Sequence, residues 1–145
     1  MKLVLQRVAN AAVYIEGQTV AKISQGLLIF FGVEKKDNSD KVNYLADKAL
    51  TLRIFQDDKG KMNFSCLDVS GEVLVISQFT LAGDCTKGKR PSFDNAAQPK
   101  EAKFLYRQFI EKVSESGLTV KEGEFGANMQ VELVNDGPVT FFLSR

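Results

Sequence analysis

The sequence predicts an α+β fold, a single domain over residues 1–145 with sheet packed on sheet and two main helices on one outer face. Two apolar runs of strand length, 27–33 and 73–76, show no alternation, which is typical of central strands buried on both faces. Two further stretches, 40–52 and 99–113, carry apolar residues at helical spacing. The predicted order is therefore three strands, a helix, more strands, a second helix and two final strands.

The first part of the chain predicts three strands. Lys2–Val8 alternates with a period of two, which places Arg7 on the apolar side of its strand. That arginine either caps the edge of the strand or is an anchored donor that points into a site. Residues 12–23 predict a hairpin with its turn at Glu16-Gly17, and the run 27–33 predicts the next strand.

The first helix is predicted to begin after an N-cap at Asn38 or Ser39 and to cover one face of the sheet. Its apolar stripe consists of Val42, Leu45, Ala46, Ala49 and Leu52. The adjacent carboxylates Asp57 and Asp58 precede Lys59-Gly60-Lys61, a pattern that favours a solvated turn over a metal site.

The functional interpretation depends on the segment Glu72–Leu81. Its apolar run predicts a central strand beside 27–33. This strand passes from the apolar run into the polar residues Ser77 and Gln78 and is predicted to end at Thr80. Polar groups at the end of a buried strand can form a site. A strand that merely leaves the core explains the same residues.

A long polar connection follows, from Leu81 to Gln98, and connections of this length are usually functional or mobile. It carries three cations on an expected exposed loop, Lys87, Lys89 and Arg90. The second helix is predicted to start at Pro99 and to end at Gly117. Its stripe of Ala102, Leu105, Tyr106, Phe109 and Val113 is core packing.

The C-terminal part predicts two alternating strands, one around Met129–Leu133 and one over Val139–Leu143, joined by a tight turn at Gly137-Pro138. The alternation turns Phe142 away from the core. A large aromatic side chain on the outer face of a terminal strand indicates a partner surface.

Composition narrows the possible functions. The chain is 44% hydrophobic and 26% charged with a net charge of +1, so contact with a polyanion requires a local patch. It has no histidine, which excludes His-based triads, and only two cysteines, Cys66 and Cys85, which are expected to be reduced. We therefore expect no structural zinc and no cofactor. No run of membrane length is present, so a cytoplasmic location is the default expectation.

Two motifs together resemble one family. Ser77-Gln78-Phe79-Thr80-Leu81 and Asn135-Asp136-Gly137-Pro138-Val139-Thr140 are similar to motifs of the D-aminoacyl-tRNA deacylases, also called D-tyrosyl-tRNA deacylases. The similarity runs from Leu3–Val8 through Lys87–Phe93 to the end of the chain. It sharpens the expected fold to the barrel-like deacylase fold, and it implies a homodimer with two sites at the subunit interface.

The resemblance also implies an enzymatic reaction. The expected activity is hydrolysis of the ester that links a D-amino acid to the terminal adenosine of tRNA, which proofreads translation. Glycyl-tRNA is an expected second substrate, because glycine lacks the side chain on which a chiral filter acts. The partners would be a second copy of the chain and the acceptor end of aminoacyl-tRNA, with no membrane.

Site residues are carried over position by position. Ser77, Gln78, Phe79 and Thr80 match the catalytic-strand motif, and Gly137 and Pro138 match a cross-subunit chirality motif whose Gly-Pro peptide bond is expected to be cis. Arg7 matches the arginine that supports this Gly-Pro turn. The cations Lys87, Lys89 and Arg90 are expected phosphate contacts near the acceptor end.

Without histidine, we expect substrate-assisted hydrolysis. In this mechanism the vicinal ribose hydroxyl orients or activates water, Thr80 positions it, and the Gln78 and Phe79 amides hold the oxyanion. A nucleophilic Thr80 is the alternative. Two other functions also remain open: a tRNA- or RNA-binding module without catalysis, and an esterase for small substrates with Thr80 as nucleophile.

Overall fold

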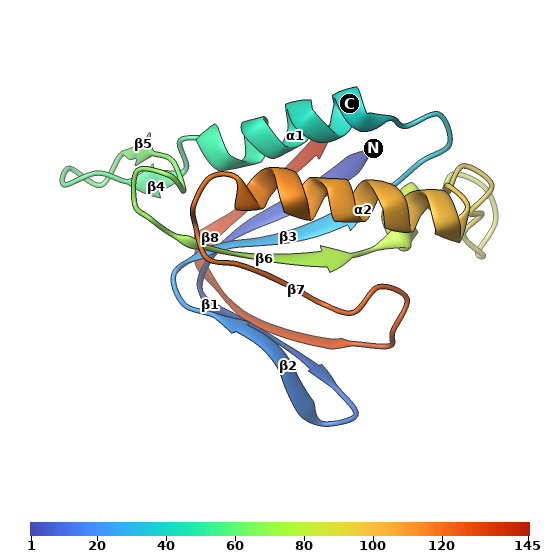
Figure 1. The fold of residues 1–145 in the computed structure, drawn as a ribbon, viewed down its shortest axis with the longest axis horizontal. Helices are drawn as coiled ribbons and strands as arrows, with labels where there is room; N and C mark the ends of the chain where they lie inside the picture. The colour runs from blue at the N-terminus through green and yellow to red at the C-terminus, as the bar shows by residue number, and fades with distance from the viewer.

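A six-stranded mixed sheet forms the body of the computed structural model, which describes residues 1–145, and two helices lie along one of its faces (Figure 1). Five of the strands follow the order β2-β1-β3-β6-β7. Strand β8 lies off this path and pairs with β1. The strands are β1 (Lys2–Ile15), β2 (Gln18–Ile23), β3 (Gly26–Gly32), β6 (Glu72–Ser77), β7 (Val120–Glu122) and β8 (Gln130–Ser144). The predicted α+β class with helices on one outer face is confirmed.

The long strand β1 bends the sheet over on itself. Its first half pairs with β3 and its second half with β2, while β8 follows it along both halves. Because one strand serves two neighbours in succession, β2 swings back into contact with β6 and β7 and the sheet nearly closes into a barrel. The predicted hairpin turn lies where expected, with Glu16 and Gly17 at positive φ between β1 and β2.

The two faces of the central strands build two cores. In β3, Leu27 and Ile29 join the core under the helices, whereas Leu28 joins Leu74 and Ile76 of β6 inside the folded sheet. Both β3 and β6 are therefore covered on both sides, which is why their sequences lack alternation. The two strands pair in parallel at the centre of the sheet, side by side as predicted.

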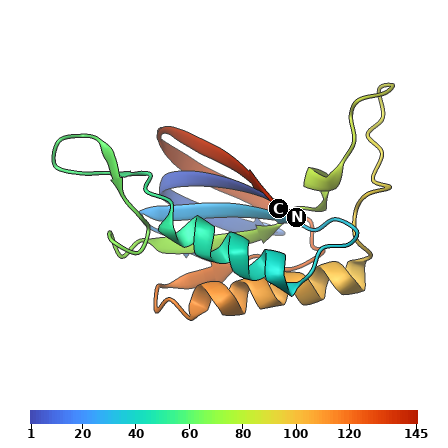
Figure 2. The same cartoon turned by 90° about the horizontal axis from the view of Figure 1, so that it is seen from above.

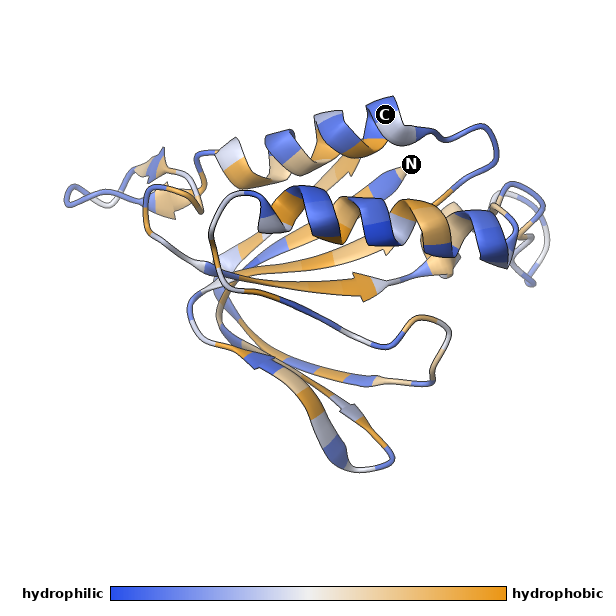
Figure 3. Ribbon diagram, viewed as in Figure 1, coloured by the Kyte–Doolittle hydropathy of each residue, from blue (hydrophilic) through white to orange (hydrophobic).

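Two helices and a small hairpin complete the fold. Helix α1 (Ser39–Thr51) begins after Asn38, whose side chain accepts a hydrogen bond from the Lys41 N–H at 3.1 Å. Helix α2 (Pro99–Ser114) starts at Pro99 as predicted and ends before the expected Gly117. The hydrophobic sides of both helices face the sheet (Figure 3). Neither helix has the length and apolarity that crossing a membrane requires. The short strands β4 (Phe55–Gln56) and β5 (Met62–Phe64) pair beyond the end of α1 (Figure 2).

One strand is shorter than predicted. Strand β6 ends at Ser77, and the chain turns at once into the 3-10 turn η1 (Phe79–Ala82) instead of continuing to Thr80. The reason is the neighbouring strand, which ends at Gly32. A Cβ at Gly32 would lie 2.8 Å from the Cβ of Leu81 and 2.9 Å from the Gln78 carbonyl oxygen, so this glycine leaves the space in which η1 crosses over.

The predicted turn at Gly137-Pro138 is also different. It does not join two strands, because β8 is one strand that pairs with β1 on both sides of the motif. Gln6 of β1 pairs with Thr140, and Val8 pairs with Asn135, so a single β1 residue faces the whole segment between. The segment 136–139 is thus a large bulge that leaves the ladder while the strand continues.

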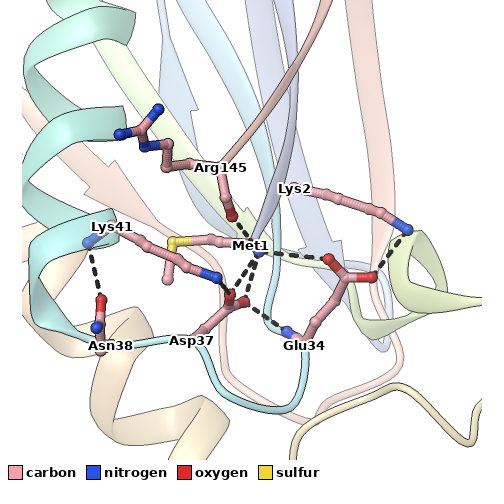
Figure 4. A network of polar contacts seen from close by, with 7 residues as sticks. All are labelled: Met1, Lys2, Glu34, Asp37, Asn38, Lys41 and Arg145. Carbon is pink, nitrogen blue, oxygen red and sulfur yellow. Dashed lines mark hydrogen bonds and ion pairs between the residues drawn. The ribbon is translucent and has the colours of Figure 1, made fainter.

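Asp37 holds the start of β1 and the start of α1 together (Figure 4). Its buried carboxylate accepts hydrogen bonds from the amino group of Met1 at 2.7 Å and from Lys41 Nζ at 2.8 Å. The Glu34 N–H donates to the same group at 2.7 Å. Burial by itself would raise the pKa of Asp37, but these hydrogen bonds outweigh it and hold the pKa below the ordinary 3.8.

The substitution Asp37→Asn is expected to lower the free energy of unfolding at pH 7 by about 3 kcal/mol, because it leaves the buried amino group of Met1 without its charged partner. A carboxylate with a lowered folded pKa stabilises the fold above its unfolded pKa and loses that contribution as pH falls through its folded pKa. The difference between the two proteins should therefore shrink below about pH 4. Urea unfolding across pH measures it, with Asp58→Asn, an exposed carboxylate in a turn, as control. A pH-independent difference would contradict the assignment.

Candidate functional site

A pocket of about 530 Å³ opens where β6 ends. Its walls come from Ser77–Phe79, from the start of α2, and from the loop between β7 and β8. Eleven of its sixteen lining residues are hydrophobic, and none of the sixteen has an ionisable side chain. A pocket of this size and character suits a small organic group, and it offers that group no acid or base of its own.

Backbone N–H groups are available at the polar end of β6, beside this pocket. The Gln78 N–H is already committed, because it donates to the Phe31 carbonyl at 2.8 Å, so the expectation that this amide holds an oxyanion is wrong. The N–H groups of Phe79 and Thr80 open the turn η1, and the first N–H groups of a helical turn have no partner within it. These two amides are the available pair.

The side chains of the same segment contact each other. The Gln78 Nε2 donates to the Thr80 Oγ1 at 2.5 Å. Neither end of a carboxamide acts as a base at neutral pH, so this contact orients the hydroxyl and does not take its proton. Ser77 and Gln78 are half-buried, and Phe79 and Thr80 are exposed.

Arg7, a residue of β1, anchors the start of the bulge in β8. It lies on the apolar side of β1, as predicted, and is 3% exposed. Its Nε donates to the Asp136 carbonyl at 2.9 Å and pairs with the Asp136 carboxylate at 3.3 Å, while Nη1 donates to the Ile54 carbonyl at 2.5 Å. Arg7 is therefore an anchored donor that holds the base of the bulge, and it does not line the pocket.

The tip of this bulge is exposed and fixed in shape. The Gly137–Pro138 peptide bond is cis, as the resemblance implies, and Gly137 has φ +141. Asn135, the first residue of the second motif, closes the bulge: its Oδ1 accepts from the Val139 N–H at 2.6 Å and its Nδ2 donates to Thr140 Oγ1 at 2.9 Å. Asparagine at the start of a turn is the signal from which this role could have been predicted.

One chain does not bring the two motifs together. Arg7, under the bulge, pairs with Leu27 of β3, which pairs with Val73 near the start of β6. Ser77 lies at the other end of β6, opposite Phe31. The separation is roughly 13 Å along the strands and about 14 Å across them at standard sheet spacings. The exposed Gly137-Pro138 tip therefore lies at a distance from the pocket of its own chain and does not line it.

The remaining predicted residues lie on the loop between η1 and α2. Lys87, Lys89 and Arg90 are exposed on it and do not line the pocket. The sequence reasoning missed Phe125 and Met129, which close the far wall of the pocket. Their only signal was the glycine-rich loop around them. Cys66 and Cys85 are both free, and no three His, Cys, Asp or Glu side chains lie together in a way that could hold a metal ion.

Comparisons with known proteins cover the whole chain. A model of the D-Tyr-tRNA(Tyr) deacylase family matches residues 4–144. The D-aminoacyl-tRNA deacylase of Thermosipho africanus is 56% identical over 143 residues, 99% of this chain and 96% of that protein. The D-aminoacyl-tRNA deacylase of Pelobacter propionicus is 54% identical over 145 residues, 100% of both chains.

Two solved structures share the fold. One is described as a c-Myc DNA unwinding element binding protein, which has a TM-score of 0.94 and 37% identity and covers 100% of this chain and 99% of its own. The other is described as a probable eukaryotic D-amino acid tRNA deacylase, with a TM-score of 0.83, 16% identity and coverage of 98% and 97%. At that identity, the second structure supports the fold alone.

Proposed function

The chain belongs to the D-Tyr-tRNA(Tyr) deacylase family, and from this premise we propose how it hydrolyses the ester of D-aminoacyl-tRNA. It is a hydrolase that releases the D-amino acid and the tRNA, and so proofreads translation. The observation that carries the assignment to a site is that Ser77–Phe79 line the pocket at the end of β6. Thr80 is the next residue of the chain and belongs to η1, and its hydroxyl lies within hydrogen-bond distance of Gln78.

The ester carbonyl is proposed to lie against the amides of Phe79 and Thr80. Two converging N–H groups stabilise the charge that develops on the carbonyl oxygen, and each such donor is worth roughly 10²–10³ in rate. Backbone donors of this kind remain in place when side chains are changed. This corrects the expected pair by one residue, since Gln78 is engaged by Phe31.

The group that directs the attacking water is proposed to come from the substrate. No lining side chain ionises, and the carboxamide of Gln78 cannot accept the Thr80 proton, so a nucleophilic Thr80 would lack a base. The terminal ribose carries a vicinal hydroxyl beside the ester. That hydroxyl orients or activates the attacking water, and Thr80 positions water or substrate by hydrogen bonding.

The chirality filter is proposed to come from a second copy of the chain. The exposed Gly137-Pro138 tip lies far from its own pocket, and in a homodimer it would enter the pocket of the partner. Main-chain atoms there would occupy the space of an L side chain and still admit the hydrogen of glycine, so glycyl-tRNA would also be cleaved. Phe142, 58% exposed on β8, offers apolar surface for the contact.

The tRNA contact is proposed to use the loop cations Lys87, Lys89 and Arg90. With a net charge of +1, the rest of the chain adds little attraction for phosphate, so this local patch would carry it. The acceptor end of tRNA is the part that reaches the pocket. We place the activity in the cytoplasm, where charged tRNA is consumed.

The expected result of a direct assay is that D-Tyr-tRNA is hydrolysed at least about 10²-fold faster than L-Tyr-tRNA, because the L side chain meets fixed main-chain atoms. Release of the amino acid at subsaturating substrate measures the ratio of kcat/KM. Glycyl-tRNA should be cleaved as well. Equal rates on the two enantiomers would contradict the filter, and hydrolysis confined to tRNA-free esters would favour the small-substrate esterase.

A second candidate is a nucleic-acid-binding module without catalysis. The solved structure at 37% identity, described as a DNA unwinding element binding protein, favours keeping it. The near-neutral charge opposes it, because affinity for a phosphate backbone grows with the number of phosphates neutralised. Strong, salt-dependent binding of RNA or DNA with no ester hydrolysis would decide for this reading.

A further inference from the structure

Two exposed aromatic rings lie together at the mouth of the pocket. Phe79 is 59% exposed and Phe93 is 38% exposed, and their ring centroids are 5.0 Å apart at an interplanar angle of 56°. Phe79 belongs to the pocket wall, whereas Phe93 lies outside it. Core packing does not explain a pair with this much exposure, and an exposed aromatic pair beside a site is a binding feature.

The position of Phe93 is built by the loop that carries it. Asp84 and Ser92 form an antiparallel bridge with hydrogen bonds of 2.7 and 2.9 Å, which closes the neck of the loop and returns the chain to η1. The ring then packs on Gly83, where a Cβ would lie 3.0 Å from Phe93 Cε1. A side chain at this position would therefore push the ring slightly away from the turn that bears Phe79.

Charge and shape around the pair suit a single nucleic-acid strand. The loop closed by the neck carries Lys87, Lys89 and Arg90, against two carboxylates, Asp84 and Asp94. The Asp84 carboxylate is occupied, since it accepts the Thr86 N–H at 2.9 Å. An open hollow of about 670 Å³ runs along Arg90–Asp94, beside Phe93. Aromatic faces next to cations are how proteins bind unpaired nucleotides.

We propose that Phe79 and Phe93 form a stacking platform for the base of the penultimate nucleotide at the 3′ end of tRNA. The inference rests on the proposed function and deepens it. The pocket of about 530 Å³ has room for the amino acid and one nucleoside, so the strand leaves across its mouth, where the two rings lie. The loop cations then meet the phosphates that follow.

The test compares two substrates that differ by one nucleotide, 3′-D-tyrosyl-adenosine and D-tyrosyl-CpA. For the wild type, kcat/KM should rise roughly tenfold when the penultimate cytidine is added, in line with the usual value of one stacked base. In Phe93→Ala this gain should disappear, while the rate on 3′-D-tyrosyl-adenosine stays unchanged. Phe93→Tyr should restore the gain. The control is Phe64→Ala, because Phe64 on β5 is 37% exposed, like Phe93, and lies at the opposite end of the molecule (Figure 1).

Three results would overturn the platform: no gain in the wild type, a full gain in Phe93→Ala, or an equal loss on both substrates, which would mark a structural role. Failure of the wild type to cleave either substrate would instead refute the proposed function. Binding of uncharged CpA, compared between the wild type and Phe93→Ala, would then still decide the platform. Equal affinities would end it.

Discussion

A D-aminoacyl-tRNA that ends in 2′-deoxyadenosine is expected to bind normally and to be cleaved at least about 10²-fold more slowly than its ribose counterpart, the usual value of a positioned acid or base. The pocket has no ionisable lining residue, so removal of the ribose hydroxyl removes the group proposed to direct the water. Single-turnover hydrolysis with enzyme in excess separates this chemical step from binding, which filter retention measures on the same substrate.

Thr80→Ala provides the matched comparison on the protein side. Its loss of rate should be clearly smaller than that of the deoxy substrate, since the amides of Phe79 and Thr80 remain in place after the side chain is removed. Because no lining side chain is ionisable, a plot of kcat/KM against pH should also show no change in rate that arises from the titration of a pocket residue. If Thr80→Ala abolishes turnover and an acyl-Thr80 adduct can be trapped in the wild type, the nucleophilic mechanism is correct.

Two inactive variants are expected to restore each other when they are produced in one cell. Gly137→Ala distorts the bulge, because its Cβ would lie 2.6 Å from Val139 Cγ2 and 3.0 Å from Arg7 Nη2 at a φ of +141, and the displaced main chain is expected to obstruct the partner's pocket. Ala127→Trp fills the pocket from a loop position that belongs to neither core. Each variant alone should be nearly inactive on D-Tyr-tRNA.

In a mixed dimer, one site combines an intact pocket with an intact partner bulge. Random assembly makes half of the dimers mixed, with one of two sites intact, so about a quarter of the wild-type activity should return by the symmetry of the pair. The control is a chain that carries both substitutions, produced together with either single variant: none of the resulting dimers contains an intact site, so no activity should return. Sedimentation showing an active monomer, or mixed dimers without activity, would contradict a shared site.

Much of the fold follows from local pattern. The two unalternating runs, the side-chain cap at Asn38 and Pro99 at the first position of α2 each act within a few residues, so the sequence alone places β3, β6 and both helices. The two site motifs were identified only by their resemblance to one family, since their residues alone also fit a strand end and a turn. The alternation of β1 already placed Arg7 on the apolar side.

Only the tertiary structure decided how these parts meet, because each remaining feature depends on a partner distant in sequence. Strand β6 ends at Ser77 because Gly32 leaves the space in which η1 crosses over β3. The Gln78 amide is unavailable because it already donates a hydrogen bond to the Phe31 carbonyl. The Gly137-Pro138 segment is a bulge and not a hairpin turn because β1 pairs with β8 on both sides of it. Local propensity specifies a strand or a turn, but hydrogen bonds and contacts between strands fix its length and register, and with them the distance between the two motifs.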